Sequence, residues 1–211
     1  MFRRESLWGR RKLIEYCLML VKIFLFVVQK FIKFQLLFIV MLRVLFDTNI
    51  YGNLVEEPDA EEIESRIKNE NDFVVYNFSL IRKEIRNIPK RTEASRKARL
   101  SLLEMYDRIT GGHYLKDSLQ ITMLAKKYFD HYRNLNGTYG WDTNIRIDFM
   151  IVACASFYGL DIVYSDDQRT MLGKEAMKAY QHININERLR TPNFLHYTDL
   201  GPQIRSLLKF S

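Results

Sequence analysis

Two short apolar runs that each lead into a carboxylate constrain the fold of this chain most. The run VLF at residues 44–46 leads into Asp47, and IVYS at residues 162–165 leads into Asp166 and Asp167. Aspartate is depleted from strands and is seldom buried without a partner, so an acid at the end of a buried strand marks either a helix cap or a site. The carboxyl ends of parallel strands lie along one edge of a sheet, and ligands bind outside that edge. If both runs belong to one parallel sheet, these acids lie close together.

Strands and helices are expected to alternate along the rest of the chain. Short apolar runs predict strands, and stretches with helical periodicity, strong helix formers and capping residues predict helices. The expected strands are 43–46, 73–76, 161–165 and 193–197. Two helices are expected to begin near Pro58 and at a cap at Ser79. Four more are expected at 92–109, 117–134, 144–158 and 170–180, the third ended by Gly159 in a left-handed conformation. A last helix is expected from Pro202. Such alternation predicts a mostly parallel sheet that helices cover on both faces.

Two further acids occupy helix positions where apolar residues are expected. Glu84 lies within the apolar stripe of its helix, three residues after Ile81 and four residues before Ile88. Asp148 lies in the same way between Ile145 and Ile151 on its own helix. A buried carboxylate is costly unless a partner compensates its charge. Both side chains are therefore predicted to point inward, where they can converge with the acids at the strand ends.

Four carboxylates in one pocket need a compensating cation. The four are Asp47, Glu84, Asp148 and Asp167. Without a cation, repulsion and desolvation would protonate some of them at neutral pH. Oxygen ligands with no Cys or His nearby favour Mg²⁺ or Mn²⁺ over zinc. The rival explanation, that each acid is a helix cap or an ion-pair partner, accounts for Asp47 alone as well as a site does, but it accounts less well for all four together.

Four short motifs, in this order along the chain, resemble the PIN-domain ribonucleases, a family that includes VapC-like toxins and related RNA-processing nucleases. The motifs are FDTNIY at 46–51, SLIRKEIR at 79–86, NIRIDFMIVACA at 144–155 and IVYSDD at 162–167. The resemblance covers residues 43–200. It implies a three-layer α/β/α sandwich with a mostly parallel central sheet, whose acidic cluster binds Mg²⁺ or Mn²⁺ and cleaves RNA.

The resemblance also assigns roles to individual residues. It places the first three acids of the family at Asp47, Glu84 and Asp148. The fourth acid of the family stands two residues after a Thr or Ser, which selects Asp167 and leaves Asp166 as the alternate. The polar neighbours that would orient ligands or phosphate are Thr48, Asn49 and Ser165. The segment 87–139 is longer than in compact toxin-type members, which weakens assignment to a toxin subtype.

The basic charge of the chain is concentrated in its first 42 residues. They hold eight of the 32 Lys and Arg residues and two of the 25 Asp and Glu residues, which leaves 24 basic and 23 acidic residues for 43–211. Residues 10–42 are strongly apolar but contain no uncharged run of the roughly 18 residues that a spanning helix needs. We interpret residues 1–42 as an extension before a nuclease domain at 43–211. The extension is either an amphipathic segment with weak membrane association or a mis-assigned translation start.

Because residues 43–211 are nearly neutral, RNA capture requires a local basic patch. The best candidates are Lys90, Arg91, Arg96, Lys97 and Arg99. Tyr106 is the expected stacking partner for a base. A solvated helix face explains the same run of charges equally well.

The sequence therefore predicts a Mg²⁺- or Mn²⁺-dependent endoribonuclease, either the toxin of a toxin–antitoxin pair or a housekeeping RNA-processing enzyme. The expected partners are the RNA substrate and, for a toxin, an antitoxin protein and a second copy of the chain. Two cysteines, Cys17 and Cys154, suit a reducing cytoplasm. The alternative is a non-catalytic RNA-binding or scaffold protein with the same fold. A phosphatase of the haloacid dehalogenase type is disfavoured, because Asn49 stands where that chemistry needs a second aspartate.

Overall fold

The computed structural model describes residues 41–69, 73–143 and 145–201, and its centre is a parallel sheet. The four strands of this sheet are β1 (Leu42–Phe46), β2 (Phe73–Val75), β5 (Ile162–Tyr164) and β6 (Asn193–Leu195). They are ordered β2-β1-β5-β6, and every neighbouring pair is parallel. The pairing sets Val44 of β1 between Val75 of β2 and Ile162 of β5. All four predicted strands are therefore present, and the prediction of a parallel sheet is confirmed.

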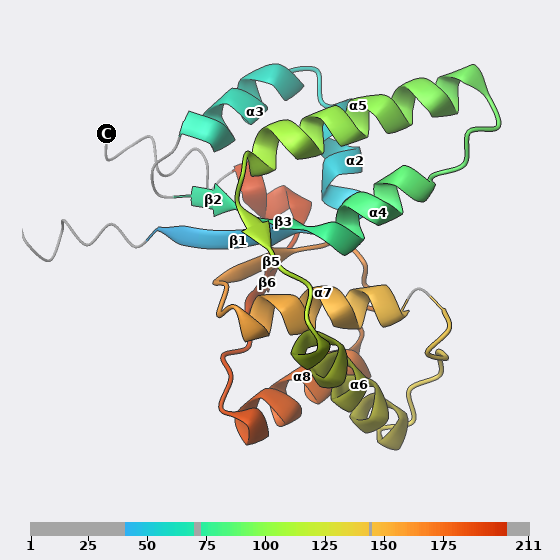
Figure 1. Ribbon diagram of the computed structural model, residues 1–211, viewed down its shortest axis with the longest axis vertical. Coiled ribbons are helices and arrows are strands. Elements are labelled where there is room, and N and C mark those ends of the chain that lie inside the picture. The colour runs from blue at the N-terminus through green and yellow to red at the C-terminus, as the bar shows by residue number, and fades with distance from the viewer. Residues whose placement is uncertain (1–40, 70–72, 144, 202–211) are drawn as a thin grey trace, which may run out of the picture. The chain divides into compact units, whose positions relative to one another are not determined.

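Helices cover both faces of this sheet (Figure 1). One layer contains α2 (Thr48–Glu56), α3 (Ala60–Asn69), α4 (Ser79–Asn87) and α5 (Glu93–Thr110). The opposite layer contains α6 (Leu119–Asn134), α7 (Ile145–Phe157) and α8 (Lys174–Glu187). A small second sheet pairs β3 (Asn77–Phe78) with β4 (Tyr114–Leu115), also in parallel. The predicted α/β/α sandwich is thus the architecture of residues 41–201.

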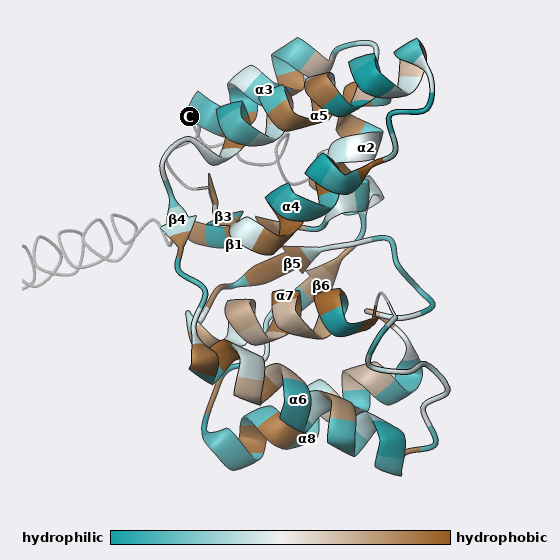
Figure 2. Ribbon diagram, turned by 45° about the vertical axis from the view of Figure 1, so that its right-hand side comes forward, coloured by the Kyte–Doolittle hydropathy of each residue, from teal (hydrophilic) through white to brown (hydrophobic). Residues whose placement is uncertain are grey.

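The apolar runs of the sequence form the core between these layers. Val44, Leu45 and Phe46 of β1 are completely buried, as expected for a central parallel strand that is covered on both faces. The Phe46 ring packs edge-to-face against Tyr51 of α2 at 5.7 Å and against Tyr164 of β5 at 5.3 Å. Apolar residues lie on the helix faces that are turned toward the sheet (Figure 2). The central position of β1 fixes where its last residue, and therefore Asp47, must lie.

Three local features differ from the prediction. The helix expected near Pro58 is present as α3 but begins at Ala60, so Pro58 lies in the preceding turn, and the helix α2, which begins directly after Asp47, was not predicted. Ser79 lies within α4, and Phe78 holds the N-cap position because β3 runs straight into the helix. The helix expected at 170–180 is α8, which begins four residues later because the chain first turns around Asp167. The left-handed conformation of Gly159 is confirmed, with a φ of 63°.

Several predictions fall wholly or partly on residues that the structure does not describe. The membrane association of residues 10–42 and the domain boundary at residue 42 stay predictions. A helical stretch runs from Tyr197 to Gly201, and the continuation expected from Pro202 lies outside the described residues. Within residues 41–201, apart from 70–72 and 144, no helix is long and apolar enough to cross a membrane.

Candidate active site

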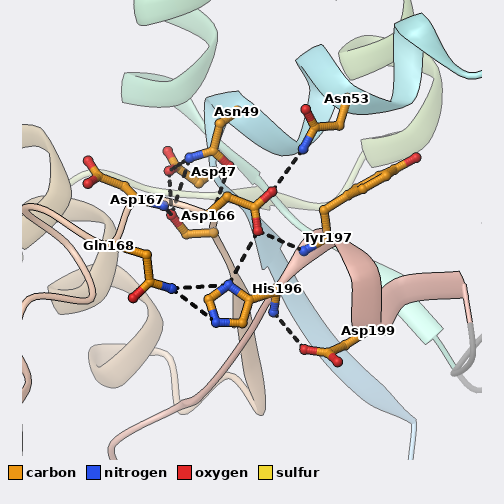
Figure 3. Close-up of polar contacts among 10 residues, drawn as sticks. Asp47, Asn49, Asn53, Asp166, Asp167, Gln168, His196, Tyr197 and Asp199 are labelled. Carbon is orange, nitrogen blue, oxygen red and sulfur yellow. Dashed lines mark hydrogen bonds and ion pairs between the residues drawn. The ribbon is translucent and has the colours of Figure 1, made fainter.

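The site lies at the edge of the sheet where β1 and β5 end. Asp47 follows β1 directly, and its backbone N–H still donates to the Tyr164 carbonyl of β5 at 2.9 Å. Asp166 and Asp167 follow β5 after one intervening residue, Ser165. Adjacent parallel strands thus bring the two acidic segments of the sequence side by side, as their pattern predicts (Figure 3).

Asp47 is held by three hydrogen-bond donors. Its Oδ1 accepts from the Thr48 backbone N–H at 2.7 Å, which makes Asp47 the N-cap of α2. Its Oδ2 accepts from Asn49 Nδ2 at 2.7 Å and from the Ser165 hydroxyl at 2.7 Å. Asp47 is therefore both the N-cap of α2 and a candidate residue of the site. The supporting roles predicted for Asn49 and Ser165 take the form of orienting this carboxylate.

Asp47 is only 6% exposed, and this burial is the largest influence on the pKa of its side chain. Burial raises the pKa of Asp47 from its ordinary value to about 6. The bonds from Ser165 and Thr48 work in the opposite direction, and the negative charges of Glu84 and Asp167 raise the pKa further. Asp47 is thus poised between its two protonation states near neutral pH.

Glu84 is connected to this carboxylate through the first turn of α2. The Thr48 hydroxyl donates to Glu84 Oε2, while the Thr48 backbone N–H donates to Asp47. Ile81 and Ile85 on the same helix are fully buried, and Glu84 is half-buried beside them. The predicted inward placement of Glu84 is therefore what the structure shows, and Thr48 links two of the four acids.

Asp148 is the least satisfied acid of the four. It lies in the first turn of α7, where Phe149 and Ile151 are fully buried, and it is itself 7% exposed. Its Oδ2 is buried and accepts no hydrogen bond from the described part of the chain. A buried oxygen without a donor carries an uncompensated desolvation penalty. The side chain points inward as predicted, and the fold alone does not stabilise its charge.

The pKa of Asp148 shows how close the other acids are. Burial raises this pKa to about 8, and the Thr170 hydroxyl partly opposes the rise. The negative charges of Asp47, Asp167 and Glu84 then raise it further, in that order with Asp47 first. The fold therefore gathers all four predicted acids into one electrostatic cluster. Among the described residues, no three acidic, histidine or cysteine side chains already stand as ligands around one point.

The two neighbouring aspartates after β5 point to different surroundings (Figure 3). Asp167 accepts from the backbone N–H groups of Arg169 at 2.8 Å and Thr170 at 2.9 Å, and its charge raises the pKa of both Asp47 and Asp148. Asp166 instead faces a separate group of residues, and its charge is not among the largest influences on the pKa of Asp47 and Asp148. This placement favours Asp167 over Asp166 as the fourth acid.

Asp166 has partners of its own at the rim of the site (Figure 3). Its Oδ2 accepts from Asn53 Nδ2 at 2.8 Å, and its Oδ1 accepts from the Tyr197 backbone N–H at 3.0 Å. His196 Nδ1 lies 3.3 Å from the same Oδ1. His196 and Tyr197 directly follow β6, so their position after a predicted strand could have placed them at this edge of the sheet. The same signal is absent for Thr170, which hydrogen-bonds Asp167 from within a turn.

The residues predicted to bind RNA lie on α5 and on the connection that leads to it. Lys90, Arg91, Arg96 and Lys97 are exposed, and Lys97 forms an ion pair with Glu93 at 3.1 Å. Arg99 is half-buried and donates to the Arg86 carbonyl at 3.1 Å. Nothing in this arrangement distinguishes an RNA surface from a solvated helix.

The prediction that Tyr106 stacks on a base was wrong. Its ring is fully buried, and its hydroxyl accepts from the Phe78 backbone N–H at 3.0 Å. The same hydroxyl lies 3.0 Å from Asn77 Oδ1. Tyr106 therefore joins α5 to β3 as part of the core.

Comparisons with known proteins found similarity only at the level of the fold. No family model and no curated protein matches the sequence. One similar structure is VapBC2 from Rickettsia felis bound to a DNA fragment from its promoter, at 12% identity over 74% of this chain and 98% of that chain, with a TM-score of 0.48. Another is VapBC-1 from nontypeable Haemophilus influenzae, at 16% identity over 74% of this chain and 99% of that chain, with a TM-score of 0.45.

Proposed function

We propose that this protein is a divalent-metal-dependent endoribonuclease whose site is built from Asp47, Glu84, Asp148 and Asp167. The observation that carries the proposal is Asp148: a carboxylate on a buried helix, with an oxygen that accepts no bond from the described residues, next to three other acids. A purely structural acid would have an Arg, a Lys or a set of N–H donors in that position. A cation compensates the charge that the fold leaves uncompensated.

The donor set suits a hard cation. The four side chains offer only carboxylate oxygens, which favours Mg²⁺ or Mn²⁺ over softer ions. The four acids would hold the ion. When bound, the ion would supply an activated water for attack on the phosphodiester and would stabilise charge on the leaving oxygen.

The residues around the acids support the same reaction. Thr48 and Ser165 each bond two groups of the cluster, so they fix the directions of Asp47 and Glu84. Asn49 donates to Asp47 and accepts from the Asp166 backbone N–H at 3.2 Å, which joins the two strand ends. Rigid carboxylates lower the reorganisation needed when charge develops in a reaction.

RNA is the proposed substrate, and the sequence motifs are the reason to prefer RNA over other phosphodiesters. For a toxin, the same resemblance adds an antitoxin protein and a homodimer as proposed partners. The second candidate function is a non-catalytic RNA-binding or scaffold role. The intact set of four acids favours the enzyme.

The decisive experiment is cleavage of end-labelled single-stranded and structured RNAs by the full chain with Mn²⁺, Mg²⁺ or EDTA. Asp148→Asn and Asp167→Asn should abolish metal-dependent cutting. Asp166→Asn is the matched control, since it removes an adjacent carboxylate that faces away from the cluster, and it should cut like the wild type. No cutting by folded wild-type protein, together with no Mn²⁺ binding in calorimetry, would remove the metal-site proposal in favour of the binding protein.

A further inference from the structure

A cavity separate from the acidic cluster lies beside α4, the helix that carries Glu84. Its volume is about 470 Å³, within the range of roughly 300–1,000 Å³ that small-molecule sites occupy. One wall is a single face of α4, formed by residues spaced three and four apart: Ser79, Arg82, Lys83 and Arg86. The facing wall comes from Asn77 of β3 and Tyr114 of β4, which are register partners. Figure 2 shows the hydrophilic surface of α4 close to this pair of strands.

The cavity carries positive charge that the described residues do not neutralise. Arg82 is paired with Asp107 through two hydrogen bonds, from Nε at 2.8 Å and from Nη2 at 2.7 Å. Lys83 and Arg86 are exposed and form no ion pair with any described residue. Arg86 also acts electrostatically on Asp107, but no carboxylate forms an ion pair with either cation within the described ranges. Two exposed cations one helical turn apart suit successive phosphate oxygens better than a single neutral ligand.

Tyr114 supplies an open aromatic ring at the mouth of this cavity. The residue is 72% exposed, which is unusual for a large side chain on a strand. Its ring pairs with no other ring in the described part of the chain. Exposed aromatic rings beside basic residues are the usual platforms on which bases of single-stranded nucleic acids stack.

Asn77 adds an amide donor at the wall of the cavity. The residue is 4% exposed, and its Oδ1 lies 3.0 Å from the Tyr106 hydroxyl. Its Nδ2 donates to no group in the described ranges, although the residue lines the cavity. The wall therefore presents a donor for an acceptor atom of a base or a phosphate.

We propose that this cavity holds one nucleotide of a single-stranded RNA substrate. Lys83 and Arg86 contact its phosphate and the next one, the ring of Tyr114 stacks on its base, and Asn77 Nδ2 donates to an acceptor atom of the nucleotide. The inference rests on the proposed ribonuclease function, because the cavity belongs to the same helix that places Glu84 in the acidic cluster. It moves the main RNA contact from residues 90–99 to the outer face of α4.

The test separates binding from cleavage. Binding of a fluorescein-labelled single-stranded RNA of about 12 nucleotides, a length within the site size of such proteins, is measured by anisotropy with EDTA at several salt concentrations. Lys83→Gln/Arg86→Gln is compared with Lys178→Gln/Arg188→Gln, which removes two exposed cations from α8 and its C-cap on the opposite layer. Tyr114→Ala is compared with Tyr114→Phe, and cleavage with Mn²⁺ is measured for each variant.

The cavity variants should weaken RNA binding about tenfold or more, and the slope of log Kd against log salt should fall by about 1.4 for Lys83→Gln/Arg86→Gln, which removes two phosphate contacts. Tyr114→Ala should weaken binding about tenfold, while Tyr114→Phe and the α8 variant bind like the wild type. Wild-type binding by the cavity variants would overturn the inference even if the enzyme cuts RNA. Loss of binding in these variants, from a wild type that binds RNA without cutting it, would uphold the cavity and refute the nuclease.

Discussion

Replacing Asp148 by asparagine should make the metal-free protein more stable, by an amount that grows with pH. In the folded protein the pKa of Asp148 is about 8, whereas the ordinary value is 3.8. The folded state therefore binds a proton more tightly than the unfolded chain. Between these two pKa values the folded state must hold a proton that the unfolded state releases, so stability falls as pH rises through this window. Asparagine has no such proton, and the variant avoids this loss.

The magnitude follows from about 1.36 kcal/mol per pKa unit. Between these two pKa values the cost of this proton to the wild type grows by about 1.36 kcal/mol per pH unit, and it reaches about 4 kcal/mol at pH 7. The stability difference between Asp148→Asn and the wild type should therefore increase by about 3 kcal/mol from pH 5 to pH 7. The amide also fills the volume of the carboxyl, so no cavity term offsets the gain.

Urea unfolding followed by circular dichroism, with EDTA present at both pH values, measures this difference. Asp166→Asn is the control, because Asp166 is exposed and bonded at the rim, and its stability difference from the wild type should stay within about 0.5 kcal/mol at both pH values. A gap for Asp148→Asn that stays constant from pH 5 to pH 7 would refute the claim that burial and neighbouring acids hold Asp148 protonated.

Three further results are expected. The proposed Mn²⁺ site requires an ionised Asp148, so Mn²⁺ affinity should rise by up to about tenfold per pH unit from pH 6 to pH 8. Calorimetry in buffers of different ionisation enthalpy should detect the released proton, and a pH-independent affinity would exclude Asp148 as a ligand. Ser165→Ala removes a hydrogen-bond donor from Asp47 and raises the pKa of that carboxyl, so Mn²⁺ affinity at pH 7 should fall about tenfold. Ser165→Thr keeps a hydroxyl donor and should largely retain the affinity. Tyr106→Phe leaves the buried Phe78 N–H without its acceptor, so the free energy of unfolding measured with urea should fall by about 1–3 kcal/mol while RNA binding stays unchanged. Weaker RNA binding by this variant would support the stacking role that the burial of Tyr106 argues against.

The location of the acids could be predicted because it depends on long-range rules that leave local marks. Asp47 and Asp167 follow apolar runs, and parallel strands place such ends at one edge. Glu84 and Asp148 interrupt apolar helical stripes, and that interruption is visible from spacing alone. In each case a rule of periodicity or topology, and not the identity of a single residue, carries the inference.

The parts that could not be predicted depend on contacts between segments that carry no periodic signal. The strands β3 and β4 have two residues each, too few to show alternation, and the cavity beside α4 exists only because they pair. Tyr106 was misplaced for a related reason. Its helix has apolar and charged residues interspersed, so spacing did not show that its hydroxyl reaches the backbone of β3.

At Asp47 a helix cap and the proposed metal site do not exclude one another, and counting acceptors shows why. A carboxylate has about four lone-pair positions, of which Asp47 uses three for Thr48, Asn49 and Ser165. These bonds fix its direction and leave room for one more partner. Asp148 accepts nothing at its Oδ2, so it offers more acceptor capacity but bears the larger penalty of burial. The N-cap bond is therefore compatible with the proposed site. It holds Asp47 rigid and favours its charged form, beside Asp148, whose charge only an added cation can stabilise.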